Sequence, residues 1–187
     1  MRSEKEKMLA GELYDPRDRQ LAEERSKARQ LLKKLNDTGE DQTKERERIL
    51  RELLPDSGEE LWLQPPFYCD YGTNIRIGDC VFFNFNCTLL DIAPITIGNR
   101  TLFGPNVQIY SASHPLSHKI RASGLECGKP VRIGEDVWVG GNVVICPGIT
   151  IGDRSVIGAG SVVTKNIPCD VVAVGNPCRV IRQLQDG

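Results

Sequence analysis

Two histidines are the side chains of this sequence best suited to acid–base chemistry. His114 lies in the segment SASHP, directly before Pro115, and His118 follows four residues later. A neutral imidazole, with a reference pKa of about 6.5, can take a proton from an alcohol that attacks a carbonyl carbon. His114 follows a regular repeat and opens a polar loop, which places it at the mouth of that loop. We therefore expect His114 to be a general base and His118 to be a surface or substrate-rim residue.

Several other reaction classes lack the residues that they require. A catalytic zinc ion held by three histidines needs one more histidine than the chain contains, so we expect no metal site. The sequence has no P-loop, no G-x-G-x-x-G after a strand and no G-x-S-x-G. The chemistry left is direct transfer, in which a base activates a hydroxyl group against a donor that already carries a reactive acyl group.

An internal repeat of six residues sets the framework that must position these side chains. From residue 133 to residue 168 the chain reads IGEDVW, VGGNVV, ICPGIT, IGDRSV, IGAGSV, VTKNIP, and each unit starts with an aliphatic residue. A helix with 3.6 residues per turn cannot keep this period on one face, whereas a short strand followed by a bend can. The repeat predicts a parallel β-helix, in which neighbouring coils stack about 4.8 Å apart. Unrelated strands of a sandwich are the alternative, but they give no reason for the fixed spacing.

A weaker copy of the repeat comes earlier, and a loop interrupts it. One frame runs through Ile77, Phe83 and Leu89, and a shift of two residues around Ala93 and Pro94 starts a second frame. That second frame is carried by Ile97, Phe103 and Ile109. Residues 111–130 leave the repeat, are polar and contain both histidines. Because loops that leave a rigid scaffold commonly carry binding residues, we expect this excursion to belong to the site.

The first part of the chain has a different character, since residues 1–60 are rich in charged side chains. Amphipathic patterns predict helices over residues 3–10, from Asp15 to about residues 36–39, and over residues 42–54. Asp15 and Pro16 read as an N-cap and a first helical residue. We expect three parts: an α-helical domain at 1–60, a β-helix at 61–170 with its excursion at 111–130, and a C-terminal strand and basic tail at 171–187.

Composition limits the partners and the compartment. With 187 residues and a net charge of −1, the chain has no overall field that attracts nucleic acid or an anionic membrane. Seven cysteines form no C-x-x-C pair, and the N-terminus lacks the apolar core of a signal peptide. No apolar run approaches the length of a membrane span. We therefore expect a cytoplasmic protein in a reducing environment.

Successive motifs carry a resemblance to a known family. They are MLAGELYDPRDRQLAEERSKARQLLKKLN at the N-terminus, then PPFYCDYGTNIRIGD, NFNCTLLD, the YSASHP box, the hexapeptide segment from GKPVRIG onward, and the closing GNPCRVIR. Taken together they resemble the hexapeptide-repeat acyltransferases, specifically the maltose and galactoside O-acetyltransferases, with nodulation acetyltransferases as relatives. The helical segment and the His-Pro box are the specific part of this resemblance, since many transferases carry hexapeptides.

The resemblance implies a left-handed β-helix, a homotrimer with sites between subunits, and acetyl transfer from acetyl-CoA to a sugar hydroxyl. It implies that His114 is the base and that Asn84 supports catalysis. The positions that it assigns to the acceptor are Asp15, Arg25, Asp70, Asn84, Asp91 and Glu126. The positions that it assigns to coenzyme A are Trp138, Gly141, Ala159, Thr164, Lys165, Arg179 and Arg182. Gly141 and Ala159 are also the small residues that the turns of the repeat favour. Lys165 and Arg179 can equally be exposed surface charges that bind no ligand.

Two other functions stay open at this point. A xenobiotic acetyltransferase is one, although its relatives generally lack the N-terminal helices, and a non-catalytic hexapeptide scaffold is the other, although it predicts a degenerate His-Pro box. The acceptor sugar is also open. Galactoside-type members carry an acid where this chain has Ile92, with Asp91 adjacent, and an apolar residue where it has Glu126.

Overall fold

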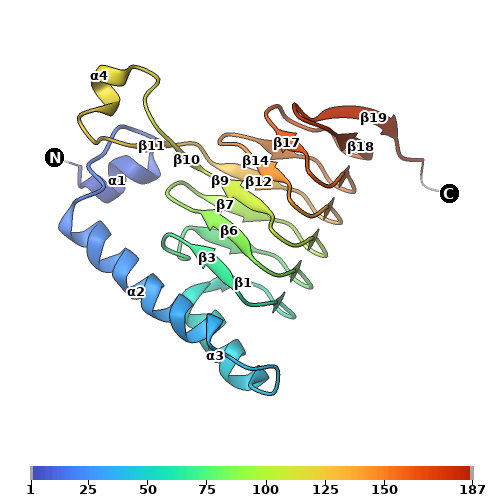
Figure 1. Ribbon diagram of the computed structural model, residues 1–187, viewed down its shortest axis with the longest axis horizontal. Coiled ribbons are helices and arrows are strands. Elements are labelled where there is room, and N and C mark those ends of the chain that lie inside the picture. Colours follow the sequence, from blue (N-terminus) through green and yellow to red (C-terminus); the bar gives the residue numbers. More distant parts are fainter. Residues whose placement is uncertain (1, 186–187) are drawn as a thin grey trace.

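The computed structural model describes residues 2–185, which form a group of helices and a parallel β-helix (Figure 1). The prediction of a mainly β fold with a small N-terminal helical region is thereby confirmed. The first residue of the expected helical domain and the last two of the expected C-terminal part lie outside the described residues. The division into domains at residues 60 and 170 stays a prediction.

The β-helix has three faces, each a sheet of stacked short strands. Face 1 contains β1 (Asp56–Ser57), β4 (Ile75–Ile77), β7 (Ile95–Ile97), β12 (Val131–Ile133) and β15 (Thr150–Ile151). Face 2 contains β2 (Trp62–Leu63), β5 (Phe82–Phe83), β8 (Leu102–Phe103), β13 (Trp138–Val139), β16 (Val156–Ile157), β18 (Val171–Val174) and β19 (Arg179–Gln183). Face 3 contains β3 (Phe67–Cys69), β6 (Cys87–Leu90), β9 (Gln108–Tyr110), β14 (Val144–Ile145) and β17 (Val162–Val163).

The repeat residues stack along the inside of the coil. All strand pairs within the faces are parallel except β18 with β19, and Ile97, Ile133 and Ile151 pair in successive coils. The residues that start the six predicted units are all buried: Ile133, Val139, Ile145, Ile151, Ile157 and Val163. Because each buries an aliphatic side chain against the coils above and below, the repeat itself builds the core.

The shift in the repeat has a structural cause. In the first coils twenty residues separate paired Phe67 and Cys87, while eighteen separate paired Val144 and Val162 in the later coils. The two additional residues fall in the turns that lead from a face-3 strand to the next face-1 strand, which we call corner 3–1. The excursion also leaves the coil at this corner. Corner 3–1 is therefore where the regular coil is enlarged.

The excursion has its own short elements. It leaves through β10 (Ala112–Ser113), forms the helix α4 (His118–Arg121), and returns through β11 (Cys127–Gly128), which pairs with β10 in antiparallel fashion. Figure 1 shows α4 projecting beyond the coil, with β18 and β19 at the far end of the molecule from the N-terminal helices. The pairing of β10 with β11 closes the excursion at its base.

The N-terminal helix α1 (Glu4–Leu9) contacts β11 and α2 (Arg19–Asn36), whereas α2 and α3 (Thr43–Leu53) lie against the first coils (Figure 1). Their predicted apolar faces are buried and join the same core as the coil interior; the buried residues are Ala28, Leu31, Leu32, Leu35, Ile49, Leu50, Leu53 and Leu54. The helices thus cap the open end that a solenoid must cover. No helix among the described residues combines the length and apolar character needed to cross a membrane.

The predicted start of the long helix is corrected. Its N-cap is Asp18, whose carboxylate accepts a hydrogen bond from the Leu21 N–H, and not Asp15. The Asp15 carboxylate instead accepts from the N–H of Arg17, and its carbonyl accepts from the N–H of Asp18. These local bonds form a turn around Pro16, so helical hydrogen bonding begins one turn later than proline at the first helical position implies.

Candidate active site

A pocket of about 320 Å³ opens beside His114, where α2, corner 3–1 and the excursion meet. It contains four of the side chains expected to act as base or to bind the acceptor: Arg25, Asp70, His114 and Glu126. The rest of the lining consists of Tyr14, Pro16, Arg29, Tyr71, Leu90, Ile92 and Ala112. Acids, cations, an imidazole and two phenol rings around a small volume suit a polar ligand rich in hydroxyl groups.

His114 is held by the base of the excursion. It directly follows β10, and the Ser111 hydroxyl just before that strand donates to the Leu90 carbonyl at 2.7 Å and accepts from the Ala93 N–H at 2.8 Å. On the returning strand, a Cβ at Gly128 would lie 3.0 Å from the Ala93 side chain and from the Ser111 carbonyl oxygen, so a side chain there would fit only if its neighbours shifted. The imidazole is exposed and makes no hydrogen bond within residues 2–185. A fixed backbone with an accessible ring suits a base that acts on a bound substrate.

A contact between the N-terminal segment and the excursion forms one wall of the pocket. Tyr14 and Glu126 exchange two backbone hydrogen bonds of 3.1 Å, and the Tyr14 hydroxyl donates to Glu126 Oε2 at 2.9 Å. Burial raises the pKa of Tyr14 far above its usual value, and the neighbouring Glu126 carboxylate acts in the same direction. Tyr14 therefore stays a hydrogen-bond donor that orients Glu126 and leaves its other carboxylate oxygen available.

A second wall is built around Arg25. Its Nη1 donates to the Tyr71 hydroxyl at 2.8 Å, its Nη2 donates to the Pro16 carbonyl at 2.6 Å, and the guanidinium lies 5.8 Å from the centre of the Tyr71 ring. Burial raises the pKa of Asp70, while the positive charges of Arg25 and Arg29 act in the opposite direction. The Asp70 carboxylate is thus partly desolvated, which strengthens a hydrogen bond from a ligand hydroxyl.

The assignment of Asp91 to the acceptor is corrected by its surroundings. Asp91 is fully buried, and its carboxylate accepts hydrogen bonds of 2.8–2.9 Å from the backbone N–H groups of Asp70, Tyr71 and Gly72. The Asp91 carbonyl accepts from the Asn74 side chain at 2.7 Å. Burial raises the pKa of Asp91 to about 6, although its backbone donors act in the opposite direction. Asp91 therefore anchors the turn that carries two pocket residues and does not reach a ligand.

Asp15 also lies outside the lining of this pocket. Its carboxylate is engaged by Arg17, whose Nε and Nη2 donate to it at 2.9 and 3.0 Å. The neighbouring Pro16 lines the pocket instead. Near the other wall, Ile92 occupies the position where the sequence departs from the galactoside type, and its apolar side chain lines the pocket. The adjacent Asp91 cannot replace the missing acid, because it is buried.

Asn84 is not brought to His114 within one chain. It follows β5 in the turns that lead from face 2 to face 3, which we call corner 2–3, whereas His114 belongs to corner 3–1. Its Oδ1 accepts from the Phe85 N–H at 2.7 Å, so its amide Nδ2 group is the part with donor capacity left. Gly141 and Ala159 lie at the same corner as Asn84, and the Gly141 carbonyl accepts from the Gly160 N–H one coil further on at 2.9 Å.

The other residues expected at coenzyme A are distributed around the later coils. Trp138 projects outward from face 2 and is 56% exposed. Thr164 and Lys165 follow β17 at corner 3–1 and are exposed, as are Arg179 and Arg182 on β19. Donor-side residues therefore occupy both edges of face 3 as well as face 2. Within residues 2–185, no group of three or more His, Cys, Asp or Glu side chains is placed to hold a metal ion.

Three polar side chains of the pocket escaped the sequence-based prediction, namely Tyr14, Arg29 and Tyr71. A signal for Tyr71 existed, because it lies in one of the enlarged turns of corner 3–1 that cause the shift in the repeat. Tyr14 and Arg29 belong to the helical segment, and only the docking of that segment on the coil brings them to the pocket. Nothing in their local sequence predicts this contact.

Comparisons with known proteins find relatives over most of the chain. Family models match at residues 7–58, the maltose acetyltransferase hexapeptide capping motif, and at residues 130–165, the bacterial transferase hexapeptide. The chain is 44% identical to galactoside O-acetyltransferase of Escherichia coli (strain K12) over 181 residues, covering 97% of the chain and 89% of that relative. A maltose O-acetyltransferase structure from Clostridium difficile 630 has a TM-score of 0.98 and 50% identity, with 99% of each chain covered. A galactoside acetyltransferase in complex with coenzyme A has a TM-score of 0.96 and 42% identity, covering 100% of this chain and 93% of the other.

Proposed function

The chain belongs to the maltose and galactoside O-acetyltransferase family of hexapeptide-repeat enzymes, and on that premise we propose that it transfers an acetyl group from acetyl-CoA to a sugar hydroxyl. The observation that carries the proposal is the exposed imidazole of His114 at a pocket with two carboxylates and two guanidinium groups. The names of the relatives suggest the acceptor class, and the coenzyme A complex of a relative suggests the donor.

In the proposed reaction His114 accepts the proton of the sugar hydroxyl while the hydroxyl oxygen attacks the carbonyl carbon of the thioester. The new C–O bond gives a tetrahedral intermediate, and the C–S bond to coenzyme A then breaks. The imidazolium returns its proton to the departing thiolate, so that charge and protons balance over the cycle. A base of this kind typically contributes a factor of about 10² to 10⁴ to the rate.

The side chains of the acceptor pocket have different roles in binding the sugar. Asp70 and Glu126 accept hydrogen bonds from ring hydroxyls, while the buried side chains of Tyr14 and Tyr71 support Glu126 and Arg25 from behind. Arg25 is already bonded to Tyr71 and Pro16, so it mainly fixes this wall in place. Both a glucose or maltose acceptor and a galactoside fit this chemistry.

We place the complete site between subunits of a homotrimer. His114 and Asn84 lie on different corners of the β-helix, so they can act on one substrate only if neighbouring chains each contribute one of them. The outward side chains of face 2 support such packing, since Trp62, Leu102 and Trp138 are 50%, 46% and 56% exposed. These side chains stack in one column with Phe82 and favour burial against another chain.

Coenzyme A fits along the donor-side residues in this arrangement. The small side chains at Gly141 and Ala159 allow the pantetheine arm to lie close to the backbone of corner 2–3. Lys165, Arg179 and Arg182 offer positive charges for its phosphates, which a protein of net charge −1 must concentrate locally. Because acetyl-CoA is an intracellular metabolite donor, we also propose a cytoplasmic location.

The test is acetyl transfer from radiolabelled acetyl-CoA to a panel of glucose, maltose, a galactoside and chloramphenicol. We expect labelled sugar, and counting label avoids the background that seven cysteines add to a thiol assay. Transfer to chloramphenicol alone would favour a xenobiotic acetyltransferase. Failure to bind acetyl-CoA would contradict the proposal and favour a non-catalytic scaffold.

A further inference from the structure

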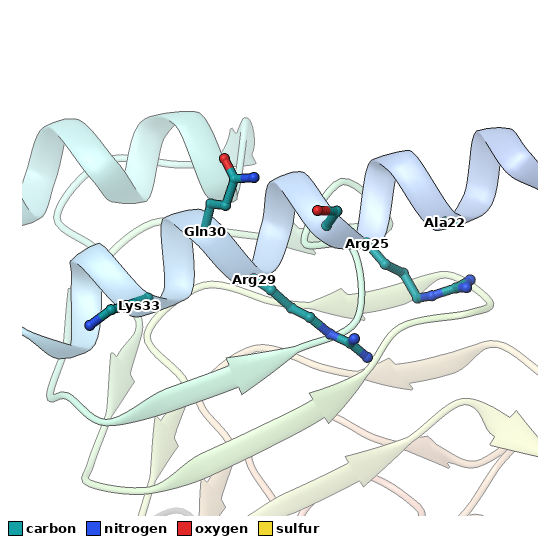
Figure 2. A pocket seen from close by; sticks show the side chains of 6 residues that line it. Ala22, Arg25, Arg29, Gln30 and Lys33 are labelled. Carbon is teal, nitrogen blue, oxygen red and sulfur yellow. The ribbon is translucent and has the colours of Figure 1, made fainter.

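A row of basic side chains on α2 extends the acceptor pocket outward. Arg25, Arg29 and Lys33 are spaced four residues apart, and with Ala22, Ser26 and Gln30 they line an open groove of about 380 Å³. Figure 2 shows the side chains of Arg25 and Arg29 extending from α2 in the same direction, beside the strands. Both arginines also line the pocket that contains His114. The groove and the pocket therefore adjoin and share these two side chains.

Arg29 differs from the other two cations in its bonding. The Arg25 guanidinium donates hydrogen bonds to the Tyr71 hydroxyl and the Pro16 carbonyl, and Lys33 Nζ donates to Asp37 Oδ2 at 2.6 Å. Arg29 is exposed, and its guanidinium has neither an ion pair nor a hydrogen bond within residues 2–185. Its charge still reaches the pocket, because it lowers the pKa of the Asp70 carboxyl against the effect of burial. Arg29 thus has all of its donors available to a ligand.

The pocket lining carries charges of both signs, and the two signs come from different elements. Corner 3–1 and the excursion contribute the Asp70 and Glu126 carboxylates, which accept hydrogen bonds from hydroxyls and repel an anion. Along α2 the lining carries Arg25 and Arg29, and a guanidinium matches phosphate or carboxylate oxygens with two parallel hydrogen bonds. A ligand with a hydroxyl at one end and a negative group at the other complements this arrangement in a single orientation.

We propose that the preferred acceptor is an anionic sugar, carrying a phosphate or a carboxylate group that binds Arg29 while a hydroxyl faces His114. This inference rests on the proposed acetyl transfer and adds the class of acceptor to it. Arg29 is then a residue that determines specificity, and it contributes to binding of the charged acceptor rather than to the chemical step.

The experiment compares glucose, glucose 6-phosphate and glucuronic acid as acceptors for the wild-type enzyme and for Arg29→Gln. We expect KM for at least one charged acceptor to be lower than for glucose by about tenfold or more, as one charge-assisted contact allows. Arg29→Gln should remove that preference, leave KM for glucose unchanged and alter kcat little. Arg29→Lys should restore part of the preference. Arg19→Gln is the matched control, because Arg19 lies on the same helix outside the lining of both the groove and the pocket and pairs with Glu23.

The outcomes separate this inference from the proposed function. Equal or better use of glucose by the wild-type enzyme, or an equal rise of KM for neutral and charged acceptors in Arg29→Gln, overturns the anionic acceptor and leaves acetyl transfer standing. No transfer to any sugar overturns both. A preference for phosphate over carboxylate, or the reverse, identifies which anion the groove selects, and added salt should weaken either preference.

Discussion

Replacing His114 with alanine is expected to lower kcat for acetyl transfer by about 100-fold or more, the usual contribution of a general base. The imidazole is exposed and makes no hydrogen bond to the rest of residues 2–185. Its loss should therefore leave the melting temperature and the affinity for acetyl-CoA nearly unchanged. Steady-state kinetics with saturating acceptor, together with binding of acetyl-CoA by calorimetry, measure the two effects separately.

The chain offers its own control for this prediction. His118 is the first residue of α4 and is also exposed, but it lies outside the pocket lining. His118→Ala should retain nearly full activity. If His114→Ala keeps wild-type kcat, or if His118→Ala loses as much activity as His114→Ala, the assignment of the base is wrong.

Replacing Asp91 with alanine is expected to lower the free energy of unfolding by about 3 kcal/mol, because buried N–H groups lose their acceptor. Three backbone N–H groups converge on this carboxylate, and no solvent reaches it. For a chain of this size the loss corresponds to a melting temperature lower by about 10 °C. The turn that carries Asp70 and Tyr71 should also loosen, so KM for the acceptor should rise in the molecules that remain folded.

Two further variants make the Asp91 prediction specific. Asp91→Asn keeps one acceptor oxygen but turns an amide donor toward the remaining N–H groups. The melting temperature of this variant should therefore lie between those of Asp91→Ala and the wild type. Asp56 is a matched surface control, because its carboxylate is 56% exposed and lies 3.4 Å from Arg76. Asp56→Ala should change stability by less than about 1 kcal/mol. Equal melting temperatures for the Asp91→Ala and Asp56→Ala variants would refute the anchoring role.

The coil was predictable because its period is a physical requirement. Every sixth residue must point inward if each face contributes one short strand and one bend, and residues such as Val139, Ile145 and Ile151 meet that requirement. The two-residue shift around Ala93 and Pro94 was also visible in the sequence, but the sequence did not show which structural change causes it. The shift marks corner 3–1, where the coil is enlarged and the pocket lies.

The site was harder to predict, because its residues come from segments far apart in the chain. An acidic side chain next to a strand does not reveal whether it faces solvent or the core, and so Asp91 was assigned to the acceptor although it is buried. The period did contain information that was not used. Asn84 and Gly140 occupy equivalent places after face-2 strands, which puts Asn84 on a different corner from His114.

The central claim is that His114 of one subunit acts together with Asn84 of its neighbour, and mixing two inactive variants tests it most directly. His114→Ala and Asn84→Ala, carrying different tags, are each expected to lose most of their activity. Trimers assembled from a one-to-one mixture should regain about one quarter of wild-type activity, because half of the sites receive an intact His114 and half of those receive an intact Asn84. Mixed trimers no more active than the two parent variants would contradict a site shared between subunits.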